Sequence, residues 1–292
     1  MSAKRKVAVL FRKDEKESNI KNYAIHGMMK YWAEHNILLE PIFGPSTKRP
    51  FVDLMFVHVN LSVVPSSYLD YASQFPIVLN GKISDIRKSV VCDHLINASN
   101  SSSQYQGPVI IKSDLNAAGL PEAKADHKIV RRLKKAYQWI KPPALKINKQ
   151  QDYQIFSSLR NVPDACFLDK KIVIQKFFPE VEDGFYHVRS YSFLGGRHSC
   201  MRISSADPVI HLGNGKKIEV VEPHPEIIAI RQKLNMDYGK LDYVLHNGIP
   251  ILFDVNKTLG ASRNETNSIV LSLRRERAKG LFPYLDLPCP SE

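Results

Sequence analysis

The sequence has few cysteines and no long apolar run, and each absence excludes a class of protein. The 292 residues include four cysteines, which stand far apart and form no C-x-x-C pair. A disulfide framework or a zinc site is therefore not expected, and we expect a reducing, cytoplasmic compartment. No apolar stretch approaches the roughly 18–20 residues that span a bilayer. The run Val7–Phe11 is also too short for the core of a signal peptide, so we expect no membrane partner.

Acidic residues are outnumbered, and the formal net charge is +12. Basic residues cluster at 131–135 and at 274–277. Such clusters can bind nucleic acid, lie on solvated helix faces, or line a cleft that concentrates anions such as nucleotides. Solvated faces are the commoner outcome, and nucleic acid is not our expected partner. The ten histidines show no H-E-x-x-H spacing or similar metal-binding pattern.

The start of the chain differs in pattern from the remainder. Apolar strands and helical segments alternate over about 80 residues, which predicts a small parallel α/β domain. Later strands pair around glycine turns and predict an antiparallel-rich α+β unit, with a helix over 83–98 before it. We place boundaries near 80 and 175. The expected units are an N-terminal parallel α/β domain (1–80), a small lobe (81–174) and a large lobe (175–292).

The most informative stretch is a hairpin at 239–260, G-K-L-D-Y-V-L-H-N-G-I-P-I-L-F-D-V-N-K-T-L-G. Two apolar runs flank an Asn-Gly turn. Asp254 and Asn256 share one face of the second strand, because strand side chains alternate. Asp242 joins that face only with an odd-length loop or a bulge. Under that condition, two carboxylates and an amide suit a hard cation such as Mg²⁺; otherwise the acids are scattered on a solvated hairpin face.

Two lysines precede the hairpin in separate elements. Lys112 ends the apolar strand P-V-I-I-K, where a charge normally needs a partner such as phosphate. The alternative is an ordinary surface-facing strand end. Lys88 falls inside the expected helix over 83–98. A flexible loop with one glycine follows Lys112.

A second apolar strand, at 171–178, ends in Gln175, Lys176, Phe177 and Phe178. Free backbone groups at a strand end can hydrogen-bond an adenine edge, with apolar side chains sandwiching the ring. Glu182 would then be placed to accept from ribose hydroxyls. An ordinary core strand is the alternative.

Arg189 and Arg202 lie on two strands that pair around Gly195-Gly196. Their neighbours are apolar or aromatic. The two guanidinium groups could clamp a phosphate or a carboxylate. They could equally be surface arginines on a half-exposed sheet.

The order of these features resembles the ATP-grasp superfamily. The resemblance covers roughly residues 80–260, and its most specific part is L-D-Y…F-D-V-N-K-T-L-G, which is similar to the family's D-[FY] and E-[VI]-N-x-x-P-G pattern. It implies an α+β fold of two lobes that sandwich ATP, behind the N-terminal α/β domain. It also implies that Lys88 and Lys112 contact the nucleotide phosphates, and that Glu182 holds the ribose.

By the same resemblance, Gln175, Lys176 and Phe178 form the adenine hinge. Asp242, Asp254 and Asn256 would bind one or two Mg²⁺ ions. This sequence departs from the family pattern at four places: Asp254 stands for the usual Glu, Leu259 for the usual Pro, Gln175 for the hinge acid, and the loop after Lys112 has one glycine.

The implied activity is that of a ligase, which uses ATP and Mg²⁺ to activate a carboxylate as an acyl phosphate for attack by an amine. Arg202 and Lys240 are the candidate catalytic residues, and Arg189 or Arg263 would anchor a small anionic carboxylate substrate. A small-molecule kinase of the same fold, similar to the inositol-phosphate kinases, is the first alternative. A non-catalytic nucleotide- or nucleic-acid-binding protein is the second. The oligomeric state cannot be read from the sequence, although proteins that resemble this one are commonly dimers and a homodimer is possible.

Overall fold

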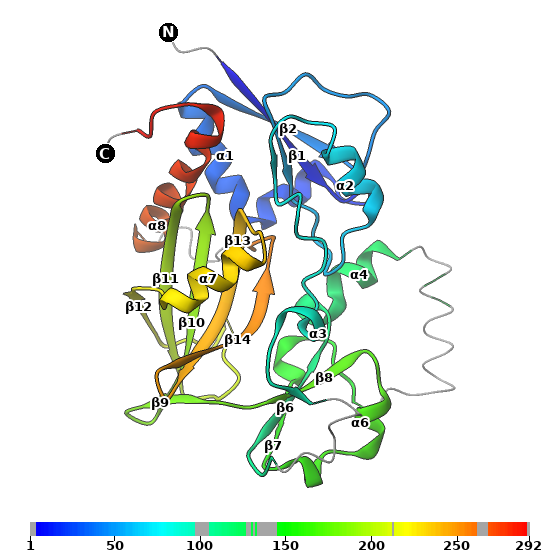
Figure 1. Ribbon diagram of the computed structural model, residues 1–292, viewed down its shortest axis with the longest axis vertical. Helices are drawn as coiled ribbons and strands as arrows, with labels where there is room; N and C mark the ends of the chain where they lie inside the picture. The colour runs from blue at the N-terminus through cyan, green and yellow to red at the C-terminus, as the bar shows by residue number, and fades with distance from the viewer. Residues whose placement is uncertain are drawn as a thin grey trace.

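The computed structural model describes residues 4–96, 105–126, 130, 132, 145–211, 213–261 and 268–290. The described residues form three sheets (Figure 1): a parallel one at the N-terminal end and two antiparallel ones below it. None of the helices within those ranges is long and apolar enough to cross a membrane.

The N-terminal sheet is parallel throughout, as the alternating pattern predicts. Its strand order is β2-β1-β3-β4. The central strand carries the run Val7–Phe11, whose five residues are fully buried because helices and the large sheet cover both faces. The elements are β1 (Arg5–Phe11), η1 (Glu17–Asn22), α1 (Ala24–Glu34), β2 (Ile37–Phe43), β3 (Leu54–Val57), α2 (Ser66–Ala72) and β4 (Val78–Leu79).

The C-terminal end of the chain packs onto this first sheet. Helix α8 (Ser268–Ala278) and the 3-10 segment η5 (Lys279–Leu285) lie beside α1 (Figure 1). Trp32 is fully buried there, and its indole nitrogen donates to the carbonyl of Ala278 at 2.8 Å. Leu281 and Leu285 belong to the same core. The first 80 residues therefore share their hydrophobic core with the end of the chain.

The second sheet is small and antiparallel, in the order β5-β8-β6-β7. The helix expected over 83–98 is wrong for most of its length. Among the described residues 83–96 it is reduced to one turn, because His94 takes a left-handed conformation (φ 63°) and the next two residues pair with β8 as a strand; residues 97 and 98 lie outside the described residues. All of β8 belongs to this sheet. The elements are α3 (Lys88–Val91), β5 (Leu95–Ile96), β6 (Val109–Ser113), η2 (Asn116–Gly119), α4 (Leu120–Ala125), η3 (Gln150–Asp152), β7 (Gln154–Phe156), η4 (Leu159–Asn161), α6 (Asp164–Leu168) and β8 (Ile172–Lys176).

The third sheet is the largest, and it contains the hairpin at 239–260. Its order is β12-β11-β10-β13-β14, with β9 paired to β10. One face is covered by α7, whose Ile227 is fully buried against the aromatic residues Tyr191, Phe193 and Tyr243. The elements are β9 (Glu180–Glu182), β10 (Phe185–Leu194), β11 (Arg197–Ser205), β12 (Lys217–Val221), α7 (Pro225–Lys233), β13 (Tyr238–His246) and β14 (Ile249–Asn256).

Asn80 joins the first sheet to the third. It follows β4 in a left-handed conformation (φ 55°) and is fully buried. Its side-chain oxygen accepts from the backbone nitrogens of Asp237 and Tyr238, each at 3.0 Å. Its side-chain nitrogen donates to the carbonyl of Tyr238 at 2.8 Å. One side chain therefore satisfies three backbone groups at the start of β13.

We expect Asn80→Ala to lower the free energy of unfolding by about 2–4 kcal/mol, because buried backbone groups left without partners cost about 1–3 kcal/mol each. Urea unfolding followed by circular dichroism measures the change. Asn36→Ala is the matched control: Asn36 is also left-handed (φ 60°) but exposed. If the two variants lose equal stability, the effect comes from backbone conformation, and the contacts of Asn80 contribute nothing.

Candidate functional site

A β-bulge places the acidic residues of the hairpin on one face. The turn at Asn247-Gly248 has two residues with positive φ, and His246 pairs directly with Ile249. That register would put Asp242 and Asp254 on opposite faces. The register shifts between Asp242 and Tyr243, so that Asp242 pairs with Asp254. The condition set by the sequence is met by a bulge at Phe253.

Lys240 shares this face with the three oxygen-bearing side chains, because it pairs with Asn256. The ammonium of Lys240 lies 2.7 Å from Oδ2 of Asp242, and the hydroxyl of Ser190 donates to Oδ1 at 2.8 Å. On the neighbouring strand, Oδ2 of Asp254 accepts from the amide nitrogen of Asn256 at 3.0 Å. Four polar side chains of one hairpin therefore face the same space.

Lys88 reaches this face from the small sheet. Its ammonium lies 3.0 Å from Oδ1 of Asp254, and the lysine is 2% exposed. Burial by itself lowers the pKa of Lys88, but the charge of Asp254 outweighs it and raises the pKa. Burial likewise raises the pKa of Asp254, but Lys88 and Lys240 outweigh it and hold the pKa below its usual value. Both groups are therefore charged near neutral pH.

The hairpin face fits a hard divalent cation. Two carboxylates and an amide are the oxygen donors that Mg²⁺ takes in proteins, with waters and phosphate oxygens as further ligands. Ammonium groups already stand 2.7 and 3.0 Å from these carboxylates, so the site accepts positive charge. In the part of the chain that the structure describes, no group of three or more His, Cys, Asp or Glu side chains is placed to hold a metal.

Lys112 is the second buried lysine of the site. Its ammonium donates to Oε1 of Gln175 at 2.9 Å and lies 4.5 Å from the centre of the Phe253 ring. Burial, with the charge of Lys88, lowers the pKa of Lys112 to about 8. Gln175 is a neutral amide, which does not compensate the lysine charge. Lys112 is thus left in need of an anion.

Lys88, Lys112 and Asp254 together line a pocket between the small sheet and the large sheet. Lys176 and Phe178, from the end of β8, form part of its wall, and the Phe178 ring contacts the rings of His94 and His246. Apolar and aromatic side chains make up most of the wall. They are Ile110, Tyr153, Phe177, Pro179, Tyr186, Val188, Pro208, Val209, Ile210, Val244, Ile251 and Phe253.

Arg189 and Arg202 lie on the opposite face of the large sheet. Arg189 pairs with Tyr243, whereas the next residue, Ser190, pairs with Asp242. The two arginines face each other across β10 and β11. Both contact Glu180, and Arg202 also contacts Glu182. The structure therefore does not bring the expected catalytic and substrate-binding arginines to the hairpin face.

Glu182 does not line the pocket either. Its exposed carboxylate pairs with Arg202, whereas Glu180, two residues earlier, reaches the pocket wall. The carboxylate of Glu180 accepts from Arg189 at 2.9 Å and from the backbone nitrogen of Leu245 at 2.8 Å. Arg263 lies outside the described residues.

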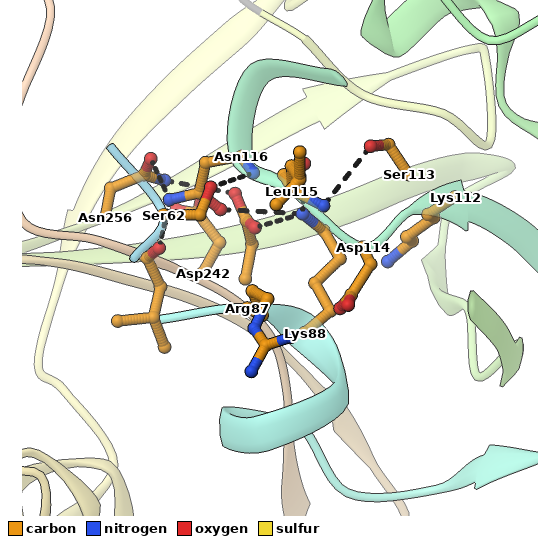
Figure 2. A network of polar contacts seen from close by, with 12 residues as sticks. Ser62, Arg87, Lys88, Lys112, Ser113, Asp114, Leu115, Asn116, Asp242 and Asn256 are labelled. Carbon is orange, nitrogen blue, oxygen red and sulfur yellow. Dashed lines mark hydrogen bonds and ion pairs between the residues drawn. The ribbon is translucent and has the colours of Figure 1, made fainter. Parts of the chain in front are cut away.

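The loop after Lys112 contributes residues that the sequence reasoning did not single out. Asp114 accepts from the backbone nitrogen and the hydroxyl of Ser89, each at 2.8 Å, and so ties α3 to the end of β6. Asn116 donates to Oδ1 of Asn256 at 3.1 Å (Figure 2). No periodicity marks either residue, because S-D-L-N reads as an ordinary polar loop.

Comparison with known proteins gives structures and no sequence relatives. No family model matches the chain, and no curated protein matches it. The macrocyclase MdnC from Microcystis aeruginosa, solved with the precursor peptide MdnA, has a TM-score of 0.50 at 8% identity over 94% of this chain and 98% of that one. D-alanine–D-alanine ligase from Bacillus anthracis, complexed with ATP, gives 0.44 at 15% identity over 98% and 99%. D-cycloserine synthetase DcsG gives 0.47 at 10% identity over 94% and 98%.

Sequence identities this low give evidence about the fold alone. The fold comparison rests on MdnC, because its TM-score reaches 0.50. The match runs over nearly the whole of both chains, so it includes the parallel sheet as well as the two antiparallel ones. The expectation of an α/β domain followed by a two-lobed α+β unit is confirmed. The chain has the ATP-grasp fold.

Proposed function

We propose that this protein is a ligase that uses ATP and Mg²⁺ to activate a carboxylate for attack by an amine. One observation carries the proposal: Lys88 and Lys112, both buried, line one largely apolar pocket together with Asp254, which pairs with Lys88 and lies opposite Asp242 in the hairpin. An apolar wall suits a base, and buried ammonium groups suit phosphates. The names of the similar structures, which include a D-alanine–D-alanine ligase, agree with this class of reaction.

Different residues of the site would hold different parts of ATP. The end of β8, with Lys176 and Phe178, would hold the base, and Lys88 and Lys112 would contact the phosphates. Asp242, Asp254 and Asn256 would hold Mg²⁺, which offsets negative charge on the phosphate oxygens when bound. Glu182 is not placed for a ribose contact, because it lies outside the pocket.

The chemistry then follows from positioning and charge. A carboxylate oxygen of the substrate attacks the γ-phosphorus, ADP leaves, and the amine attacks the resulting acyl phosphate and releases phosphate. Lys240 is the remaining catalytic candidate, because it shares the face of Asp242 and can offset charge on the reacting oxygens. Lys88 and Lys112 would position the phosphate groups during both steps.

We expect Asp242→Asn and Asp254→Asn each to lower ATP turnover by about 100-fold or more, because each removes half of the carboxylate charge that holds the metal. The two should differ in stability. Asp254→Asn leaves Lys88 buried without its counter-ion and should lose about 3 kcal/mol, whereas Lys240, the partner of Asp242, is 30% exposed and can turn to water.

Phosphate release from ATP in the presence of mixed amino acids measures turnover, and thermal melting measures stability. Unchanged turnover in both variants would show that the metal assignment is wrong. Transfer of the γ-phosphate to a stable product, with no free phosphate, would identify a kinase instead.

Nucleotide affinity should fall as pH rises through about 8, because the phosphates need the charged form of Lys112, whose pKa is lowered to about 8 by burial. Below pH 8, Lys112 is mostly protonated, and the affinity for the nucleotide is at its highest. If protonation is required, the Kd rises about tenfold between pH 7 and pH 9. Titration calorimetry with a non-hydrolysable ATP analogue measures it. Lys112→Arg, which stays charged, should flatten the profile; a flat profile in the wild type contradicts the role of Lys112.

A further inference from the structure

The loop after β6 closes a ring of contacts with the metal-binding hairpin (Figure 2). Lys88 contacts Oδ1 of Asp254 at 3.0 Å and the carbonyl of Leu115 at 3.3 Å. Asn256 donates to the other oxygen of Asp254, and its own Oδ1 accepts from Nδ2 of Asn116 at 3.1 Å. The side-chain oxygen of Asn116 lies 3.5 Å from the ammonium of Lys88. Lys88 and the hairpin thus both make polar contacts with the loop.

Asn116 also makes hydrogen bonds outside this ring of contacts. Its Nδ2 also donates to the carbonyl of Val255 at 2.6 Å, and its backbone nitrogen donates to the hydroxyl of Ser62 at 2.9 Å. Ser62 belongs to the segment that follows β3, and its backbone nitrogen donates to Glu122 at 2.7 Å. Asn116 therefore fastens the loop to the N-terminal domain and to the hairpin at the same time, and it is itself buried.

The fastened loop is strained immediately beyond Asn116. Ala117, Ala118 and Gly119 follow one another with φ of 47°, 55° and 75°. Left-handed φ is unfavourable for alanine, whose Cβ crowds the backbone there. Polar contacts of Asn116 hold a conformation that the two alanines disfavour, and release of the loop would relieve that strain. Ala117 lines the pocket, so release would also change its wall.

We propose that Asn116 latches the loop at 113–122 onto the hairpin, and that this latch competes with the magnesium complex of ATP. The inference rests on the proposed function, because it concerns entry to the same site. The N–H of Asn116 presents the positive end of its dipole to Oδ1 of Asn256, where a cation would be repelled. Phosphate would likewise take Lys88 from Leu115 and Asn116. Binding therefore opens the latch, and the latch sets the affinity.

Two measurements on the full chain test the latch. Asn116→Ala should bind a non-hydrolysable ATP analogue with Mg²⁺ about three- to tenfold more tightly than the wild type, because one or two hydrogen bonds no longer compete. In the protein without ligand, amide hydrogen exchange across 113–122 should become faster, since the loop has lost its fastening. Lys124→Ala, at an exposed position of α4 just beyond this segment, is the control and should change neither value.

The outcomes separate the two proposals. If the wild type binds the analogue and Asn116→Ala binds it equally or more weakly, Asn116 positions the site instead of blocking it, and the latch is overturned. Unchanged exchange across 113–122 overturns it as well. If neither protein binds the analogue with Mg²⁺, the proposed function itself fails, and the latch falls with it.

Discussion

The ion pair between Lys88 and Asp254 is the contact on which the site depends. Lys88 comes from the short helix before the small sheet, and Asp254 comes from the large sheet, so the pair joins the two walls of the pocket. Removing two charges from water is expensive, and a buried pair contributes little net stability. Breaking it costs far more, at about 3–5 kcal/mol, because one charge is left buried. A ligand that separates Lys88 from Asp254 must therefore supply a partner to each, and a phosphate with its metal ion does so.

The second requirement is the bulge at Phe253. Without it, the two-residue turn would send Asp254 to the face that α7 covers, and the carboxylates would never meet. With it, Asp242, Asp254, Asn256 and Lys240 share one face of the hairpin, and Asp254 lines the pocket from that face. The extra residue is also used, because the Phe253 ring lies against the ammonium of Lys112. One local irregularity thus sets both the face proposed to bind the metal and part of the proposed phosphate site.

The sequence predicted the parts of the site that follow from strand alternation. Asp254 and Asn256 share a face at any register, and the Asn-Gly turn located the hairpin. The bulge left no signal, because Phe253 reads as one more apolar residue. The positions of Arg189 and Arg202 could not be read either. Their face depends on pairing with β13, and the acids that neutralise them lie on β9 and β12. Asn116 acts through tertiary contacts alone, which no local pattern records.

Metal-dependent nucleotide binding is the central proposal, since Lys88, Lys112, Asp254 and an apolar wall line one pocket. Titration of the wild-type protein with a non-hydrolysable ATP analogue, with and without Mg²⁺, tests it most directly. The account predicts binding of one nucleotide per chain, at least tenfold tighter with the metal, because the carboxylates repel free phosphate and attract its magnesium complex. Equal affinity in the two conditions, or no binding in either, would contradict it.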